Sequence, residues 1–424
     1  MSKRFHIITY GCQMNVYDSR VVAEILRRQG WEEVDSPEVA DVIMVNTCTV
    51  RAHAERRALG RLRVLVGLKK QRPVKVGVLG CMAQHLKEKV FELVPGLDFA
   101  VGPDGYERLP ELIEAGGAYF PPLTRLYTGV HPQPDRPYSA FVTIMRGCDS
   151  FCTYCIVPYV RGRVRSRPVN DILEEIQGLL DRGIKEIILI GQNVNLYNYD
   201  GIDFTELLDK VADMGIERIG FLTSHPKYFD MRLIEVIASH PNIIRELHLP
   251  VQAGSNKILH RMNRGYTGEE YLALIDRIRE AIPDVALTTD IMVGFPGETE
   301  ADFEATLDLV KRVRFHYAYM FKYSMRPGTV ASKWQDDVPE TEKLRRLREL
   351  IQLQNSITRE RRLEMIDNTY EVLVERKSRK GDEYFGRTIQ NIPVVIDGDV
   401  QPGNTVRVKI IKLVGCTPYG VVSG

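Results

Sequence analysis

The sequence lacks several features that would place the protein in a simple class. No apolar stretch approaches the ~18 residues that a membrane-spanning helix needs. Neither charge is in excess, because 57 Lys and Arg stand against 56 Asp and Glu, which excludes a histone-like electrostatic binder. The first residues, MSKRFHIITYGC, suggest a strand followed by a turn and not a charged leader before an apolar segment. We therefore expect a cytoplasmic protein with no membrane partner, in which contact with nucleic acid comes from local basic clusters.

Cysteine is also scarce. Seven cysteines in 424 residues are too few for a secreted disulfide scaffold. Their grouping is informative, because three are dispersed, three are clustered and one is isolated. The dispersed cysteines are Cys12, Cys48 and Cys81, the clustered ones are Cys148, Cys152 and Cys155, and the isolated one is Cys416. For Cys416 we expect only a packing role.

The first predicted domain, residues 1–120, repeats a unit in which an apolar strand leads through a turn into an amphipathic helix. The strands are expected at 5–10, 41–46 and 74–79. Such alternation predicts an α/β fold with a doubly wound parallel sheet. Cys12, Cys48 and Cys81 each follow one of these strands, and ligands bind at the carboxyl ends of parallel strands. We predict that the three thiols form one iron–sulfur site, although each alone is equally well explained as a buried thiol.

The rest of the chain is predicted to form a linker, a barrel and a second, smaller barrel. Residues 121–137 are rich in Pro and Gly and are the linker. From 138 to 364 strand and helix signals alternate again, which predicts a partial (β/α)6 barrel with a trailing charged helix. Its strands are expected near 139–146, 186–191, 218–224, 246–251, 285–293 and 317–324. Residues 365–424 alternate β-branched and polar residues between turns, which predicts a small all-β, OB-like barrel of the kind that binds RNA.

The clustered cysteines follow the strand AFVTIMRG on a tight loop. Cys148, Cys152 and Cys155 can bind three irons of a [4Fe–4S] cluster and leave the fourth iron open to a cofactor or substrate. A structural zinc site would lack a nearby fourth ligand, and structural thiols rarely cluster so tightly, so the pattern favours the cluster.

The motif CDSFCTYC resembles the signature of radical S-adenosylmethionine enzymes. In those enzymes the open iron binds S-adenosylmethionine, and one electron cleaves it to a 5′-deoxyadenosyl radical. The resemblance implies that Cys148, Cys152 and Cys155 are the cluster ligands and that Tyr154 lies near the adenine of the cofactor. With TYGCQMNVYDS, NTCTVR, LGCMAQ, CIVPYVRGR and LIGQNVNLY, the whole chain resembles the methylthiotransferases. That family implies two [4Fe–4S] clusters, the second on the N-terminal cysteines, and a C-terminal TRAM-like barrel.

The segment YGCQMN with Tyr17-Asp18-Ser19 is most similar to the branch that acts on N6-dimethylallyladenosine in tRNA. This implies insertion of a methylthio group at C2 of that adenosine beside the anticodon, with two molecules of S-adenosylmethionine. The implied partners are the tRNA anticodon loop and an electron donor such as flavodoxin or ferredoxin. Val164 in RGRVRSRP departs from the family, where an acidic residue is frequent.

Several alternatives stay open at this point. The same chemistry could act on threonylcarbamoyladenosine in tRNA or on an aspartate of a ribosomal protein. A non-catalytic iron–sulfur protein that binds RNA and a zinc-dependent RNA modifier are the alternatives from other classes.

Polar residues at the ends of the predicted barrel strands are candidate contacts of the cofactor. They are Gln192, Asn193, Ser224, Gln252 and Asp290. Each is equally well explained as a partner for loop backbone groups. Arg264 is a further candidate, as a bidentate partner of a carboxylate or as a solvated arginine at a helix end.

Two groups of arginines are candidate contacts for RNA phosphate. Arg161, Arg163, Arg165 and Arg167 alternate along a segment that we expect to be extended, which would place them on one face. The second group comprises Arg56, Arg57, Arg61 and Arg63, for which a solvated face is an equal explanation.

Overall fold

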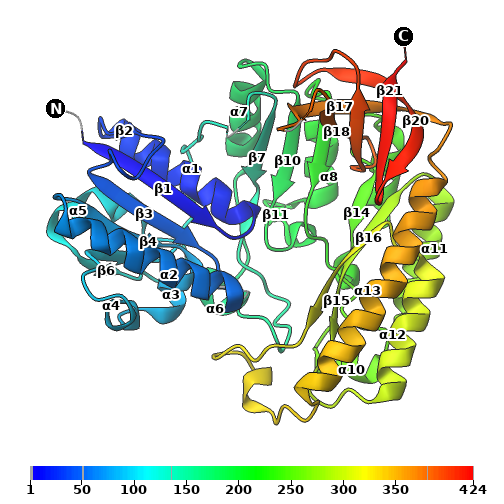
Figure 1. The fold of residues 1–424 in the computed structure, drawn as a ribbon, viewed down its shortest axis with the longest axis horizontal. Helices are drawn as coiled ribbons and strands as arrows, with labels where there is room; N and C mark the ends of the chain where they lie inside the picture. The colour runs from blue at the N-terminus through cyan, green and yellow to red at the C-terminus, as the bar shows by residue number, and fades with distance from the viewer. Residues whose placement is uncertain (1–2, 50–51, 135, 380, 424) are drawn as a thin grey trace.

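The computed structural model describes residues 3–49, 52–134, 136–379 and 381–423. Figure 1 shows an N-terminal α/β region beside a half-open barrel of strands and helices, with a small β-barrel near the C-terminus. Within these described ranges, no helix combines the length and the apolar character needed to cross a membrane.

The N-terminal region is built on a sheet of six parallel strands in the order β2-β1-β3-β4-β5-β6. The strands are β1 (Arg4–Tyr10), β2 (Glu32–Glu33), β3 (Val42–Thr47), β4 (Lys75–Leu79), β5 (Phe99–Val101) and β6 (Gly117–Tyr119). The predicted doubly wound sheet is confirmed. The strands that the sequence did not reveal are β2, β5 and β6, because two or three residues are too few to show a periodic pattern.

Helices cover both faces of this sheet. One face carries α1 (Gln13–Arg28) and α5 (Leu109–Ala115), and the other carries α2 (Ala52–Gly67), α3 (Cys81–Leu86) and α4 (Lys89–Leu93). Alternation along β3 explains this, since Val42 and Met44 pack in the core with α1, whereas Ile43 and Val45 pack with α2. A strand buried on both faces needs a continuous apolar sequence.

The central region is a partial barrel of two three-stranded parallel sheets. Its strands are β7 (Ser139–Thr143), β10 (Glu186–Ile190), β13 (Arg218–Phe221), β14 (Glu246–His248), β15 (Ala286–Val293) and β16 (Tyr317–Lys322). An isolated bridge between Ile219 in β13 and Ile243, three residues before β14, links the chain segments of the two sheets. The helices are α6 (Val157–Arg161), α7 (Val169–Leu180), α8 (Phe204–Ala212), α9 (Arg232–Ser239), α10 (Asn256–Arg261), α11 (Gly268–Ala281), α12 (Glu300–Val313) and α13 (Glu340–Leu363). All six predicted strands are present, and the predicted barrel is confirmed.

Two short antiparallel pairs interrupt the barrel. β8 (Met145–Arg146) pairs with β9 (Arg165–Ser166), and β11 (Asn198–Tyr199) pairs with β12 (Ile202–Asp203). The β8–β9 pair closes the base of the loop that carries the clustered cysteines.

The C-terminal region is a closed barrel of five strands in the order β17-β18-β19-β21-β20, as predicted. The strands are β17 (Thr369–Lys377), β18 (Tyr384–Thr388), β19 (Pro393–Asp397), β20 (Thr405–Val414) and β21 (Thr417–Val422). Arg387 donates to Glu186 at 2.8 Å, and Arg218 donates to the Thr388 carbonyl at 2.7 Å. Because Glu186 and Arg218 are the first residues of β10 and β13, the small barrel packs against the amino ends of the large barrel's strands. The clustered cysteines lie at the opposite, carboxyl ends.

Candidate active site

The three dispersed cysteines meet at the carboxyl edge of the N-terminal sheet. Cys12 follows β1 and precedes α1, Cys48 follows β3, and Cys81 begins α3 after β4. Both β1 and β4 pair with β3, so the three loops are neighbours. The Cys48 backbone N–H donates to the Tyr10 carbonyl at 3.0 Å, which joins two of these loops directly. The structure therefore brings the three thiols together, and their role as iron ligands stays a prediction.

The Cys12 thiol is more acidic than the Cys81 thiol. A hydrogen bond with Cys48 is the main reason why the pKa of Cys12 falls to about 6. The charge of Arg161 and the backbone N–H groups of Asn15 and Met14, at the start of α1, lower this pKa further, while desolvation opposes them. In contrast, burial raises the pKa of the Cys81 thiol. A thiolate is the form that binds iron, so Cys12 is prepared for ligation near neutral pH.

Glycine and buried asparagine give these loops their shape. Gly80 has φ +87°, and a Cβ there would lie 2.3 Å from the Asn46 side-chain oxygen. The Asn46 amide is held in turn, because its Nδ2 donates to the Asn15 carbonyl and to Ser19 Oγ, each at 2.9 Å. The structural role of these asparagines was not predicted, although Asn46 is a polar residue at the end of the apolar strand IMVNT.

The clustered cysteines lie on the loop between β8 and α6. Burial and the neighbouring Cys152 raise the pKa of Cys155 to about 12, and burial raises that of Cys148. Gly147 starts the loop with φ +82°, and a Cβ there would lie 1.9 Å from the Arg163 carbonyl oxygen. The loop conformation thus depends on glycine at this position.

Contacts from the rest of the barrel hold this loop in place. The Gly147 N–H donates to the Gln192 side chain, at the end of β10. The Thr153 N–H donates to the Met262 carbonyl at 3.1 Å, and Thr153 Oγ1 donates to the Arg261 carbonyl at 2.8 Å. The three thiols are therefore presented by a loop that is fixed at both ends.

Both trios consist of thiols alone, which are the ligands that iron–sulfur clusters prefer. Three thiols at each site would leave one iron of a [4Fe–4S] cluster open, whereas a structural zinc site needs four ligands. The number and type of the donors thus suit a cluster at each trio.

Three adjacent buried polar groups lie at the carboxyl ends of β10 and β13. Asn193 Nδ2, Ser224 Oγ and His225 Nε2 are buried and have no hydrogen-bond partner among the described residues. Burial, with Arg264 and Lys227 nearby, lowers the pKa of His225 to about 2, so its ring is neutral. Its Nδ1 accepts from the Lys227 N–H at 3.2 Å, which leaves the proton on Nε2. Buried polar groups are normally paired, so this arrangement fits a polar ligand such as S-adenosylmethionine.

The other predicted cofactor contacts have partners within the protein. Gln192 accepts from Gly147, as described above. Gln252 has φ +72°, and its backbone N–H donates to the Asp290 carbonyl at 2.9 Å. The Asp290 carboxylate lies 3.7 Å from His248 Nε2. Contact of these residues with a cofactor stays a prediction.

Arg264 is not the solvated arginine that was one of its two expectations. It is 4% exposed, which contradicts a solvated arginine. Its Nη1 donates to Cys152 Sγ at 3.3 Å, its Nε to Tyr266 Oη at 3.0 Å, and its Nη2 to the Pro250 carbonyl. These partners within the protein are a thiol, a phenol and a carbonyl, and the pairing of Arg264 with a carboxylate of the cofactor stays a prediction. Tyr154 lies edge-on to Phe295 with ring centroids 6.4 Å apart, and its place near an adenine stays a prediction.

The expectation that four alternating arginines share one exposed face is wrong. Arg161 ends the helix α6, and Arg165 lies in β9, so the segment is not one extended strand. Three of the four side chains are buried or nearly so and pair with carboxylates. The partners are Asp18 for Arg161, Asp104 for Arg165, and Asp171 and Glu175 for Arg167. Only Arg163 is well exposed, 3.3 Å from Asp149, and only for this residue does contact with RNA stay a prediction.

In the second arginine group, Arg56, Arg57 and Arg63 are exposed. Arg57 lies over the Tyr10 ring at 5.6 Å, and Arg63 Nε donates to the Leu93 carbonyl at 3.1 Å. A solvated face and a contact with phosphate both remain compatible with these positions.

Asp18 was predicted only as part of the motif Tyr17-Asp18-Ser19, and its buried ion pairs were not predicted. It is fully buried on α1, and its two oxygens lie 2.5 Å from Arg146 Nη2 and 2.7 Å from Arg161 Nη1. Tyr106 Oη donates to it at 3.3 Å. The available signal was an acidic residue among the apolar positions of an amphipathic helix, next to Tyr17.

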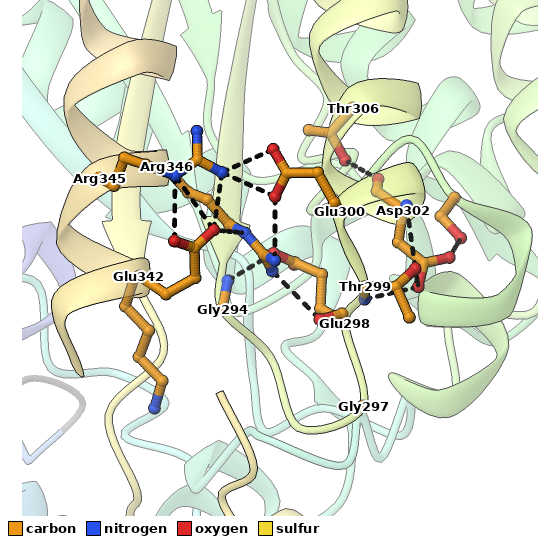
Figure 2. Close-up of polar contacts among 12 residues, drawn as sticks. Gly294, Gly297, Glu298, Thr299, Glu300, Asp302, Thr306, Glu342, Arg345 and Arg346 are labelled. Carbon is orange, nitrogen blue, oxygen red and sulfur yellow. Dashed lines mark hydrogen bonds and ion pairs between the residues drawn. The ribbon is translucent and has the colours of Figure 1, made fainter. Parts of the chain in front are cut away.

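The turn after β15 is held by the long helix α13 (Figure 2). Glu298 Oε1 accepts from the Gly294 N–H and from Arg346 Nη1, both at 2.8 Å. Figure 2 also shows Arg345 beside Glu300. The distance between Arg345 Nη2 and Glu300 Oε1 is 2.6 Å. These ion pairs fix the carboxyl end of β15, which forms part of the mouth of the barrel.

Models of three protein families match this chain. The Radical SAM superfamily matches residues 142–310, the family described as "Uncharacterized protein family UPF0004" matches residues 4–102, and the TRAM domain matches residues 364–414.

Full-length relatives bear one name, tRNA-2-methylthio-N(6)-dimethylallyladenosine synthase. The protein from Chlorobium luteolum is 44% identical, with 100% of this chain and 98% of the relative covered. The proteins from Parabacteroides distasonis and Bacteroides thetaiotaomicron are 45% and 46% identical, with 99% of this chain and 95% and 96% of the relatives covered. The chain belongs to this synthase family. The resemblance seen in the sequence is thereby confirmed, and the family carries a radical S-adenosylmethionine domain with its [4Fe–4S] cluster.

Solved structures share the fold at much lower identity. The radical S-adenosylmethionine methyltransferase TsrM from Kitasatospora setae, with cobalamin and a [4Fe-4S] cluster bound, matches with a TM-score of 0.61 and 17% identity over 78% of this chain and 77% of that chain. The cobalamin-dependent enzyme OxsB matches with a TM-score of 0.56 and 13% identity over 82% of this chain and 56% of that chain. These similarities support the fold and nothing further.

Proposed function

We propose that this chain is a tRNA methylthiotransferase that inserts a methylthio group at C2 of N6-dimethylallyladenosine beside the anticodon. The observation that carries the proposal is the closeness of two separate trios of thiols. Cys81, from the N-terminal trio, packs in one buried cluster with Ile156, which directly follows Cys155 of the barrel trio, and with Val160, five residues after Cys155. Full-length relatives bear the name of this activity, which supports the substrate.

The proposed reaction needs a radical because C2–H of an adenine is not acidic and its carbon bears no leaving group. When bound, a [4Fe–4S] cluster on each trio and two molecules of S-adenosylmethionine would supply the radical that removes hydrogen from C2 and the methylthio group that forms the new C2–S bond. The protein's own residues have three tasks. They bind the cofactors, orient the substrate base and exclude water.

Named residues fit these tasks. The neutral ring of His225 offers an N–H donor at the barrel mouth, and Asn193 and Ser224 offer further unpaired polar groups. Phe295 and Tyr323 form a buried aromatic pair with ring centroids 5.2 Å apart, against which Tyr154 packs. Such an apolar wall keeps water from a reactive intermediate.

The small C-terminal barrel supports binding of RNA. It matches the TRAM domain, and it carries three aromatic rings that have a cation above them. These pairs are Arg376 over Phe385 at 4.2 Å, Lys412 over Tyr419 at 4.5 Å and Lys377 over Tyr384 at 5.8 Å. Cations with stacked aromatic rings are typical of surfaces that bind single-stranded nucleic acid. We infer that tRNA contacts this barrel while its anticodon loop reaches the cysteine sites, and that the enzyme works in the cytoplasm with a flavodoxin or ferredoxin as electron donor.

The test combines iron counting with analysis of the product. After anaerobic reconstitution we expect about eight irons per chain, falling to about four in a Cys148→Ala, Cys152→Ala, Cys155→Ala variant. With S-adenosylmethionine and a reductant, the parent should convert tRNA that carries N6-dimethylallyladenosine to its 2-methylthio form, detected by mass spectrometry of nucleosides. Matched reactions with tRNA that carries threonylcarbamoyladenosine and with ribosomal protein should give no product.

Each alternative predicts a different result. About four irons that fall to none would leave the N-terminal thiols without a cluster and would contradict the mechanism. Product from threonylcarbamoyladenosine or ribosomal protein alone would reassign the substrate. Failure to cleave S-adenosylmethionine in the reduced, iron-loaded protein would favour a non-catalytic RNA-binding protein, and zinc in place of iron would favour the metal-dependent alternative.

A further inference from the structure

Arg161 connects the two cysteine sites. Its Nε donates to Cys81 Sγ, in the N-terminal trio, at 3.0 Å. Arg161 itself is the last residue of α6, the helix that follows the loop of Cys148, Cys152 and Cys155. The side chain is 3% exposed, so its hydrogen bond to sulfur is shielded from water.

The orientation of Arg161 is fixed by a buried carboxylate. Asp18 lies 2.7 Å from Arg161 Nη1 through one oxygen, and 2.5 Å from Arg146 Nη2 through the other. Arg146 stands two residues before Cys148 and lies over the Tyr127 ring at 4.8 Å. A continuous series of buried contacts therefore leads from Cys81 to the start of the barrel loop.

Arg161 also has an unused donor. Its Nη2 is buried and has no hydrogen-bond partner among the described residues. Buried guanidinium N–H groups are normally paired, and the sulfur atoms of a cluster are hydrogen-bond acceptors. This second observation indicates that a further acceptor belongs at the N-terminal site.

We propose that Arg161 is a positioning residue that holds Cys81 and raises the reduction potential of the cluster bound by Cys12, Cys48 and Cys81. A reduced cluster is more negative than an oxidised one, so a nearby cation and an N–H donor to sulfur stabilise the reduced form. Asp18 offsets part of the charge, but it does not accept from the Nε–H that faces the sulfur. This role rests on the proposed function, because it requires a cluster on the N-terminal trio.

The test isolates the N-terminal cluster. The Cys148→Ala, Cys152→Ala, Cys155→Ala protein is the parent, and Arg161→Gln is added to it. A redox titration followed by electron paramagnetic resonance should give a lower reduction potential for Arg161→Gln than for the parent. Each tenfold decrease in the equilibrium constant for reduction of the cluster corresponds to 59 mV. Arg163→Gln is the matched control, because Arg163 is exposed and only two residues away, and its potential should equal that of the parent.

A second measurement covers the case in which Arg161→Gln loses its iron. The reduced parent, labelled with 15N-arginine, should show a hyperfine coupling from nitrogen in pulsed resonance spectra. Arg264 lies at the other site, which is empty in this parent, so the coupling would come from Arg161. Arg161→Lys keeps the charge but should lose this coupling.

The outcomes separate this inference from the proposed function. An unchanged potential in iron-loaded Arg161→Gln, or no 15N coupling in the iron-loaded parent, would overturn the role of Arg161 and leave the second cluster intact. A parent without iron would instead remove the second cluster, and the proposed function would fail together with the inference.

Discussion

The two cysteine sites of this protein are assembled in opposite ways. Cys148, Cys152 and Cys155 stand within eight residues on one loop, so their closeness is a local property of the chain. Cys12, Cys48 and Cys81 are spread over 70 residues on three loops, and only the parallel pairing of β1, β3 and β4 brings them together. The first site therefore depends on one loop, whereas the second depends on the register of a whole sheet.

The two sites also have features in common. Each places a buried arginine on one thiol, Arg264 on Cys152 at 3.3 Å and Arg161 on Cys81 at 3.0 Å. Each uses a glycine of positive φ directly before a cysteine, Gly147 in the barrel and Gly80 in the sheet. Although the two sites are assembled differently, both hold a thiol beside a buried arginine and use a glycine before a cysteine.

The strongest test of the comparison removes one trio at a time. We expect Cys148→Ala, Cys152→Ala, Cys155→Ala to abolish cleavage of S-adenosylmethionine. The Cys12→Ala, Cys48→Ala, Cys81→Ala variant should retain about four irons and reductive cleavage but form no methylthio product. Quantification of 5′-deoxyadenosine and of the modified nucleoside in the same reaction checks this. Loss of cleavage in both variants would show that the sites are not independent.

The next test changes only the backbone before each cysteine. Gly147→Ala and Gly80→Ala should each lose the cluster of their own site, because a Cβ would lie 1.9 Å from the Arg163 carbonyl oxygen and 2.3 Å from the Asn46 side chain, respectively. Iron should fall to about four per chain in either variant. Gly178→Ala in α7 is the control, since a Cβ there meets nothing within 4 Å, and it should gain about 0.5–1 kcal/mol of stability with iron unchanged. Full iron in both loop variants would contradict the need for glycine.

The buried ion pairs between the two regions give a smaller effect. Asp18→Asn leaves Arg146 and Arg161 without their carboxylate in a buried site, which should lower the free energy of unfolding by about 3–5 kcal/mol. Asp149→Asn is the control, because its ion pair with Arg163 is exposed and should contribute about 0–1 kcal/mol. Urea unfolding of the apoprotein measures both. Equal midpoints for the two variants would show that Asp18 does not stabilise the contact between the regions.

The smallest expected effect concerns the thiols of the apoprotein. The pKa of Cys12 is lowered to about 6, whereas that of Cys155 is raised to about 12, so at pH 7 only Cys12 of this pair is a thiolate. The rate of Cys12 alkylation by iodoacetamide should therefore rise with pH with a midpoint near pH 6. At pH 7 this rate should be only about twofold higher than that of an ordinary thiol, because a lower pKa raises the thiolate fraction but also makes the thiolate a weaker nucleophile. Cys48→Ala should move the midpoint upward because it removes the main hydrogen bond. Peptide mapping by mass spectrometry measures the extent of Cys12 alkylation at each pH. A midpoint that stays near pH 6 in Cys48→Ala would show that the helix N–H groups and Arg161, and not Cys48, lower the pKa of Cys12.

Most of the architecture could be predicted because each strand or helix has a hydrophobic pattern that is visible within a short stretch of the sequence. The continuous apolar strands at 41–46 and 74–79 indicated the parallel sheet, and six strand signals from 138 onward indicated the barrel. The closed C-terminal barrel followed from alternating residues and turns. In each case one element carries its own signal over five or more residues.

The sequence by itself determined which residues we propose as cluster ligands, because the spacing of CDSFCTYC and the cysteine after each strand are local features. Only the tertiary structure decided which charges meet. The arginines at 161, 165 and 167 form a regular basic pattern in the chain, yet Arg161, Arg165 and Arg167 pair with buried carboxylates. The partners of Arg161 and Arg165, Asp18 and Asp104, come from the distant N-terminal region. A charge pattern in the sequence does not indicate whether a charge will be solvated, since burial and counter-charge depend on residues that are remote along the chain and adjacent only after folding.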